Sequence, residues 1–170
     1  MENKMEFPPM EELMAQYRAG VEAQLRAGRC EVLRIDVTLT GHTLEEPEPG
    51  YTILTLPFTG FADGPWFHGE ILPGAADVQR RRDGKTERFC ADYWLEGRDY
   101  TDEKCRVHIV NVDEGDGWKP TVTADSDALR FLNGADCFTV MEMRRIGPIV
   151  HIYADAPREG RLAVADPTRI

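Results

Sequence analysis

The chain has 170 residues, of which 42% are hydrophobic and 29% charged, so it is long enough for one domain with a sizeable core. Its formal net charge of −10 repels phosphate backbones and anionic membranes, so we expect neither nucleic acid nor a membrane as a partner. The basic run Arg80-Arg81-Arg82 precedes Asp83-Gly84, and we interpret it as the charged approach to a hairpin turn.

The cysteines are far apart and include no Cys-x-x-Cys pair; they are Cys30, Cys90, Cys105 and Cys137. Free thiols in a reducing compartment fit this spacing better than a disulfide framework, and zinc ligation is disfavoured. No apolar signal segment follows the first residues, and no apolar run approaches the length of a membrane span. These features predict a cytoplasmic protein.

An N-terminal helix is predicted over residues 9–28. Its apolar residues recur at helical spacing, Pro9 suits a first helical turn, and Gly28 suits the residue after the end. The apolar stripe comprises Met10, Leu13, Met14, Tyr17, Val21 and Leu25. This stripe packs either on the body of the same domain or on a partner.

Residues 30–155 predict strands and turns. Leu33, Ile35 and Val37 alternate with polar residues, and similar runs recur about every ten residues, without helical crossovers. Residues 45–50 are predicted as an acidic, proline-rich loop, and Asp83-Gly84 as the turn of a hairpin. We therefore predict a mainly β protein: a single antiparallel β-barrel of about eight to ten strands with one N-terminal helix. Residues 1–170 form one domain, with 156–170 as an irregular tail.

The densest group of glycines and polar side chains lies in residues 58–79, FTGFADGPWFHGEILPGAADVQ. Together with Asp83-Gly84, the run 91–93 (ADY) and the strand 107–111, it resembles the bacterial and fungal domain-of-unknown-function 3237 family over residues 32–153. The resemblance implies a small antiparallel barrel of the calycin or allene-oxide-cyclase-like kind, and little about function. Val78 stands where the family has Trp, and Asp92 stands where it has Arg.

A pair of carboxylates is the first candidate for chemistry. Alternation puts Asp77 and Gln79 on one face of their strand, and near-symmetric pairing about the Asp-Gly turn would bring Asp92 close to Asp77. Two close carboxylates repel, so one would hold its proton near neutrality and form an acid/base pair with the other. The alternative is that both acids face water and take part in no reaction.

Histidines supply further candidates. His68 and Glu70 share a strand face, and His108 lies in the strand 106–112. The histidine that a cupin-like site would place two residues after His68 is replaced by Glu70, so we predict no metal. We take His108 as a possible catalytic residue, although a strand histidine such as His108 or His151 is more often a hydrogen-bonded bystander.

Other polar residues are candidates for substrate binding. They are Gln79, Tyr93, His68, Glu70, Asn111 and Glu142. Glu142 stands between apolar neighbours and faces either water or a cavity. Aromatic residues, Tyr93 among them, line a ligand pocket or fill the core.

The sequence leaves three functions open. The first is an acid/base enzyme without a cofactor, of the isomerase, cyclase or lyase type, acting on a small apolar or aromatic carbonyl compound through Asp77, Asp92 and His108. The second is a non-catalytic, lipocalin-like binding protein. The third is an accessory subunit that docks through residues 10–27. Each of the three allows a homo-oligomer.

Overall fold

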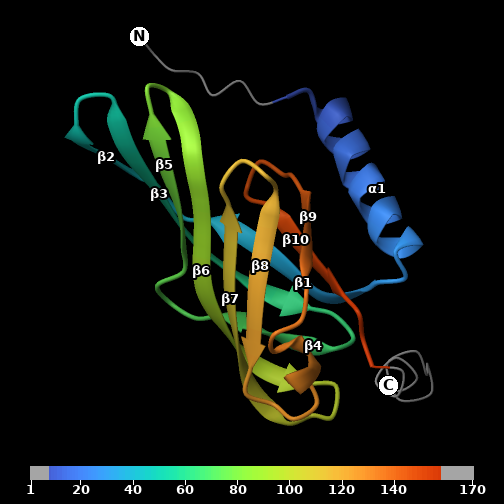
Figure 1. The fold of residues 1–170 in the computed structure, drawn as a ribbon. Helices are drawn as coiled ribbons and strands as arrows, with labels where there is room; N and C mark the ends of the chain where they lie inside the picture. The colour runs from blue at the N-terminus through green and yellow to red at the C-terminus, as the bar shows by residue number, and fades with distance from the viewer. Residues whose placement is uncertain (1–7, 158–170) are drawn as a thin grey trace.

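A computed structural model describes residues 8–157 of the chain. The tail expected over residues 156–170 therefore lies almost entirely outside the described residues. One α-helix and ten strands make up the described part, together with a single 3₁₀ turn, Arg130–Leu132 (Figure 1). The elements are α1 (Met10–Arg26), β1 (Cys30–Leu39), β2 (Thr43–Glu48), β3 (Tyr51–Asp63), β4 (Phe67–Ile71), β5 (Ala76–Arg82), β6 (Lys85–Asp99), β7 (Lys104–Asp113), β8 (Trp118–Ala124), β9 (Phe138–Glu142) and β10 (Ile149–Ala154).

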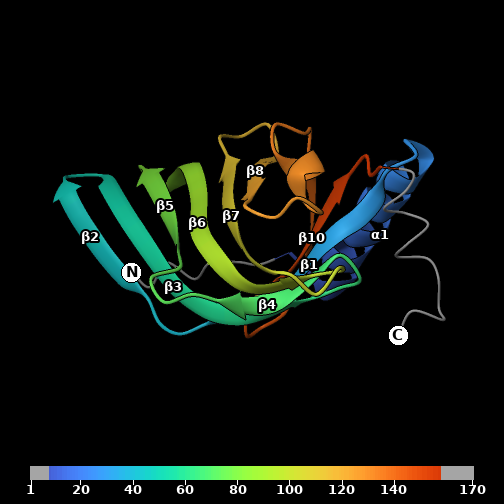
Figure 2. The same ribbon diagram turned by 90° about the horizontal axis from the view of Figure 1, so that it is seen from below.

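The strands form one antiparallel sheet that curls into a barrel, which confirms the predicted fold class. Its order is β8-β7-β6-β4-β3-β1-β10-β9, while β2 pairs with β3, and β5 fills the space between β3 and β6 beyond β4. Figure 2 shows the curvature from below, with β4 at the bottom of the curve. The amide of Asn111 on β7 donates to Thr139 Oγ1 on β9 at 3.1 Å, so side chains join the two sides of the barrel where the sheet ends meet.

Alternation along the strands decides which side chains fill the barrel. Leu33, Ile35 and Val37 on β1 lie on the same side as Ala62, Gly60 and Phe58 of β3, and all five of the apolar side chains are buried. The same face continues across β6, β7 and β8 through buried apolar residues; these are Tyr93, Leu95, Val107, Ile109, Val122 and Ala124. We call this face the interior face.

The four cysteines are free, with Cys105 and Cys137 buried and Cys30 and Cys90 half-buried.

The prediction of a proline-rich loop over residues 45–50 is wrong in part, because residues 43–48 form the edge strand β2. Pro47 interrupts the ladder with β3, whose register shifts between Glu45 and Glu48. Proline has no backbone N–H to donate, so it is tolerated on an edge strand that pairs on one side only. Every residue of β2 is exposed, so its sequence lacks the alternation of apolar and polar residues that identifies a strand with one buried face.

The helix α1 packs on the outside of the barrel, beside β9 and β10 (Figure 1). Gly20 lets it approach closely, since a Cβ there would lie 2.9 Å from Val140 Cγ1. Tyr17 packs its ring against His151 of β10, with 5.3 Å between ring centroids. The apolar stripe thus packs partly on the same domain, although Met10 and Leu25 are exposed. No helix within the described residues has the length and apolar character needed to span a membrane.

Candidate functional site

The register of the β5–β6 hairpin separates the two predicted catalytic aspartates, so the expected Asp77–Asp92 pair is wrong. Arg82 pairs with Lys85 and Arg81 with Thr86, but Arg80 then pairs with Arg88, which leaves Glu87 as an extra residue in β6. Without this bulge Asp77 would face Cys90 and share a side with Asp92. A shift of one residue moves every later side chain to the opposite face. In the structure Asp77 pairs with Ala91, whereas Asp92 pairs with Ala76.

Asp92 and His108 lie on the outer wall of the barrel. The Asp92 Oδ1 atom is 2.7 Å from His108 Nε2, and the carboxylate side chain is 61% exposed. The neighbouring Trp94 stacks flat on the His108 ring, with 4.4 Å between centroids and 6° between planes. The two predicted catalytic residues therefore form a hydrogen-bonded pair of their own, on the face opposite to Asp77.

The interior face brings together four of the predicted residues: Asp77, Gln79, Tyr93 and Asn111. One row runs across three strands, because Asp77 of β5 pairs with Ala91 of β6, and Ala91 pairs with Asn111 of β7. The small side chain of Ala91 thus lies between two larger polar ones. Both Asp77 Oδ1 and Asn111 Oδ1 are buried and have no hydrogen-bond partner within the described residues. Buried polar atoms are rarely left unpaired, so this row is the strongest candidate for a ligand site.

The surroundings of Asp77 change its acidity. Burial raises the pKa of the Asp77 carboxyl. The hydrogen bond from Gln79 Nε2 to Asp77 Oδ2, at 3.0 Å, and the nearby backbone of Cys90 both lower this pKa, but by less than burial raises it. Gln79 is held in turn by Arg81, whose Nη2 donates to Gln79 Oε1 at 3.0 Å. Burial also raises the pKa of Tyr93, so its hydroxyl stays protonated and can donate. The site therefore combines an acid/base group with a fixed donor.

Aromatic rings flank the row on both sides along the strands. Tyr93 packs edge-on against Phe58, with 5.1 Å between centroids. In the opposite direction, Phe89 contacts Trp118 at 5.5 Å. Because β6 residues 89, 91 and 93 point to the same face, the polar row lies between these two aromatic pairs. Such surfaces favour flat or apolar ligands.

The remaining predicted ligand-binding residues lie elsewhere. His68 and Glu70 on β4 are exposed and point outward, since Phe67, Gly69 and Ile71 alternate with them toward the core. In residues 8–157, no three His, Cys, Asp or Glu side chains are grouped so that they could hold a metal ion. His68 and Glu70 therefore do not join the polar row on the interior face, and their role in substrate binding stays a prediction.

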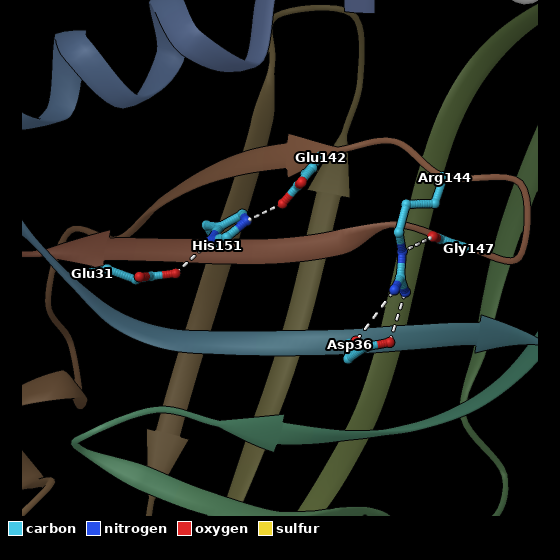
Figure 3. Close-up of polar contacts among 6 residues, drawn as sticks. All are labelled: Glu31, Asp36, Glu142, Arg144, Gly147 and His151. Carbon is cyan, nitrogen blue, oxygen red and sulfur yellow. Dashed lines mark hydrogen bonds and ion pairs between the residues drawn. The ribbon is translucent and has the colours of Figure 1, made fainter. Parts of the chain in front are cut away.

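Glu142 also points away from the interior, toward the side of the barrel that α1 covers. There it lies 3.0 Å from His151 Nε2, while the other ring nitrogen of His151 contacts Glu31 (Figure 3). His151 is 5% exposed. Burial alone lowers the pKa of His151, but the hydrogen bonds and charges of Glu31 and Glu142 outweigh it and raise the pKa.

Sequence reasoning missed this cluster, because Glu31 and His151 lie 120 residues apart. Farther along the same wall, Arg144 makes two contacts with Asp36, at 2.7 and 3.3 Å, and donates to the Gly147 carbonyl at 3.0 Å (Figure 3). These contacts fix the β9–β10 turn onto β1. We therefore assign both groups to the attachment of β9, β10 and α1 rather than to the ligand site.

Comparison with solved structures shows the fold. A protein of unknown function from Clostridium acetobutylicum ATCC 824 is 16% identical over 75% of this chain and 96% of its own, with a TM-score of 0.60. An enzyme from Penicillium herquei is 11% identical over 75% of this chain and 93% of its own, with a TM-score of 0.57. A beta-barrel like protein from Acinetobacter baumannii AYE is 11% identical over 74% and 94% of the two chains, with a TM-score of 0.54.

Neither sequence comparison found a relative. No protein-family model matches the chain, and no curated protein matches it. The class defined here is thus an antiparallel β-barrel with a polar row on its interior face, and membership of the domain-of-unknown-function 3237 family stays a prediction.

Proposed function

We propose that the protein is an acid/base enzyme of the isomerase, cyclase or lyase type, with Asp77 as its proton-transferring group and a small apolar or aromatic carbonyl compound as its substrate. The observation that carries this proposal is the pair of buried, unpaired oxygens, Asp77 Oδ1 and Asn111 Oδ1, on either side of Ala91. Within the described residues each lacks a donor, which a bound ligand would supply.

Each polar residue of the row has a role in this proposal. The Asp77 carboxylate removes a proton from the carbon beside the substrate carbonyl, and its raised pKa makes it a stronger base than an ordinary carboxylate. Tyr93 lies diagonally across the strand pair, and its hydroxyl, which keeps its proton, donates a hydrogen bond to the oxygen of the resulting enolate. Gln79 holds Asp77 Oδ2 in position. Return of the proton to a different carbon completes an isomerisation.

Asn111 would recognise a second group of the substrate. Its amide nitrogen is used by Thr139, which leaves the carbonyl oxygen as an acceptor for a substrate hydroxyl. Because Asn111 is only 1% exposed, this oxygen has little access to bulk water. The flanking rings of Phe58 and Phe89 supply apolar surface for the rest of the molecule.

The two other candidate functions fit these observations less well. A lipocalin-like carrier needs a lining that is almost entirely apolar, and the interior face instead holds an aspartate, a glutamine and an asparagine. An accessory subunit needs the apolar face of α1 to be free, and Tyr17 and Gly20 instead pack on the barrel. A cytoplasmic location, a small-molecule partner without nucleic acid or membrane, and membership of the family stated above remain parts of the proposal.

Hydrogen exchange into a simple carbonyl compound tests the proposal. β-Tetralone is an aromatic-fused ketone with acidic protons beside its carbonyl, and proton NMR in deuterated buffer follows their replacement. We expect the wild type to accelerate exchange over buffer and Asp77→Asn to lose about 100-fold of that acceleration. Asp92→Asn is the matched control, because it removes an equivalent charge from the other face of the same hairpin, and it should keep the wild-type rate.

Two results would contradict this assignment. If Asp77→Asn exchanges β-tetralone as fast as the wild type, Asp77 is not the base. If Asp92→Asn instead loses the activity, the chemistry belongs to the outer wall and the pair that Asp92 forms with His108.

A further inference from the structure

The outer face of the β5–β6 hairpin contains a groove of about 470 Å³, a volume in the range of small-molecule sites. We call it the outer groove. It lies on the side of the hairpin opposite to Asp77, and Tyr93 is the one residue of the proposed catalytic site that also borders it. Its walls comprise Pro73, Gly74, Ala75, Ala76, Val78, Arg80, Arg88, Cys90, Asp92, Tyr93 and Trp94.

Charge and polarity change in order along the outer groove. The cross-strand pair at one end consists of Arg80 and Arg88, and the next pair consists of Val78 and Cys90. Ala76 and Asp92 form the third pair, and Trp94 follows at the far end. The groove thus has a cationic end, an apolar middle and an end with an acid and an aromatic ring.

Of the two arginines, only Arg80 has a positive charge that no carboxylate within residues 8–157 matches. Like charges directly across a strand pair repel, so this pair is unfavourable unless an anion lies between or beside them. Arg88 Nε is paired with Glu114 at 3.2 Å. Arg80 Nη1 instead donates to the neutral Tyr51 hydroxyl at 3.0 Å, and within residues 8–157 Arg80 forms no ion pair with a carboxylate. On a protein of net charge −10, this is a local site for an anion.

The aromatic end is rigid and partly open. Trp94 is 45% exposed, which is high for a tryptophan in a strand. It cannot rotate freely, because it stacks on His108, and His108 is hydrogen bonded to Asp92. A fixed and accessible indole ring is a suitable surface for stacking or edge contact with a flat ligand.

We infer that the outer groove binds an aromatic carboxylate, with its carboxylate at Arg80 and Arg88 and its ring system along Val78 and Cys90 toward Trp94. The Asp92 carboxylate repels the anionic end and so fixes this orientation. Planar guanidinium groups match the geometry of a carboxylate, and the apolar middle of the groove matches the ring. This inference stands independently of the function proposed for Asp77.

The test uses β-naphthoate as the probe, with heteronuclear NMR of the full-length protein. We expect β-naphthoate to shift the Trp94 indole N–H signal, which Trp94→Phe identifies among the three tryptophans. Arg80→Gln should weaken the Kd about tenfold or more, as loss of a charge-assisted hydrogen bond implies. Arg106→Gln is the matched control, because Arg106 lies on the same wall but pairs with Glu96 at 2.8 Å outside the groove. It should bind as the wild type does.

Further measurements distinguish specific binding in the outer groove from general attraction of anions. Neutral β-naphthamide should bind at least tenfold more weakly than β-naphthoate, and Asp77→Asn should leave the β-naphthoate Kd unchanged. Equal weakening by Arg80→Gln and Arg106→Gln would show non-specific attraction and overturn the inference. It would also be overturned if β-naphthoate left Trp94 unshifted, or if sedimentation showed that Arg80→Gln only separates two copies of the chain that cover the groove.

Discussion

Asp77 combines two properties that folding alone would not favour. Its carboxyl is partly buried on the interior face, and one of its oxygens has no partner in the described part of the chain. Ionising such a group costs free energy in the folded state that it does not cost in the unfolded chain. Residues that lower stability in this way are characteristic of functional sites.

The first prediction concerns this cost. We expect Asp77→Asn to raise the free energy of unfolding at neutral pH by about 1 kcal/mol, because it removes a charge that burial disfavours. The Asn oxygen can still accept from Gln79. Because burial raises the pKa of Asp77, the cost appears as pH rises through that pKa, so the gain should vanish in acid, where Asp77 is protonated.

Urea unfolding of the wild type and Asp77→Asn at several pH values measures this difference. If Asp77→Asn is less stable than the wild type at every pH, Asp77 holds the fold together and our assignment is contradicted.

At the scale of single residues, alternation correctly placed Asp77 and Gln79 on one face. It failed for Asp92, because it assumed regular pairing about the Asp-Gly turn. Nothing in the local sequence marks Glu87 as the bulged residue, and one extra residue is enough to reverse the facing of all the residues beyond it. Whether two side chains on adjacent strands are neighbours can therefore be predicted only when the register between the two strands is known.

At the scale of elements, a glycine pair lets β4 and β6 approach closely. Gly69 is paired with Gly97, and a Cβ on Gly97 would collide with the carbonyl oxygen of His68. We predict that Gly97→Ala lowers the free energy of unfolding by about 3 kcal/mol, because the backbone must move to relieve the overlap.

Gly41→Ala is the control for this prediction, since a Cβ at Gly41 meets nothing within 4 Å. Thermal unfolding should show a large decrease in Tm for Gly97→Ala and almost none for Gly41→Ala. Similar Tm values for the two variants would show that β4 and β6 do not need the close approach.

The attachment of α1 and β10 should depend on pH. Because the pKa of His151 is raised in the folded state, its contribution to stability is complete below the unfolded value of about 6.5 and is lost as pH rises through the folded value. We predict that the wild type loses stability as pH rises through this range, above about 6.5, and that His151→Gln does not. Denaturant unfolding at several pH values measures how the free energy of unfolding changes with pH in the wild type and in His151→Gln. The same change with pH in both proteins would contradict the role of His151.

At the scale of the whole molecule, Asp99 holds one end of the barrel. This residue, 2% exposed, accepts hydrogen bonds from Thr101 N at 2.8 Å, Thr101 Oγ1 at 2.6 Å and the Ser126 hydroxyl. It thereby joins the β6–β7 turn to the loop after β8. Burial alone would raise the pKa of Asp99, but these hydrogen bonds lower it overall.

Acid should therefore loosen this end of the barrel. A lowered pKa gives a stabilising contribution that is present above the unfolded value near 4 and is lost as pH falls through the folded value. We predict that Asp99→Asn costs about 2 kcal/mol at neutral pH, as expected for hydrogen bonds to a charged group, and that the difference shrinks in acid. A difference that is constant with pH in urea unfolding would contradict this.

The barrel as a whole was predictable because its signals are local. Alternating apolar residues indicated the strands, and Asp83-Gly84 indicated a hairpin without any knowledge of the rest of the chain. The contact of Asn111 with Thr139 and the cluster around His151 depend on how distant strands meet, and no short sequence pattern encodes that. The edge strand β2 was missed because all of its residues are exposed, so its sequence shows no alternation of apolar and polar residues.

The pKa of Asp77, measured by carbon-detected NMR titration in the wild type and in Asp92→Asn, decides between an interior acid/base site and a surface carboxylate. We predict that the Asp77 carboxyl titrates clearly above the ordinary value of about 4, because it is buried on the interior face. We also predict that Asp92→Asn leaves this titration unchanged, because Asp92 lies on the opposite face. An ordinary titration of Asp77 would contradict the interior acid/base site, and a pKa that falls in Asp92→Asn would contradict the register on which it rests.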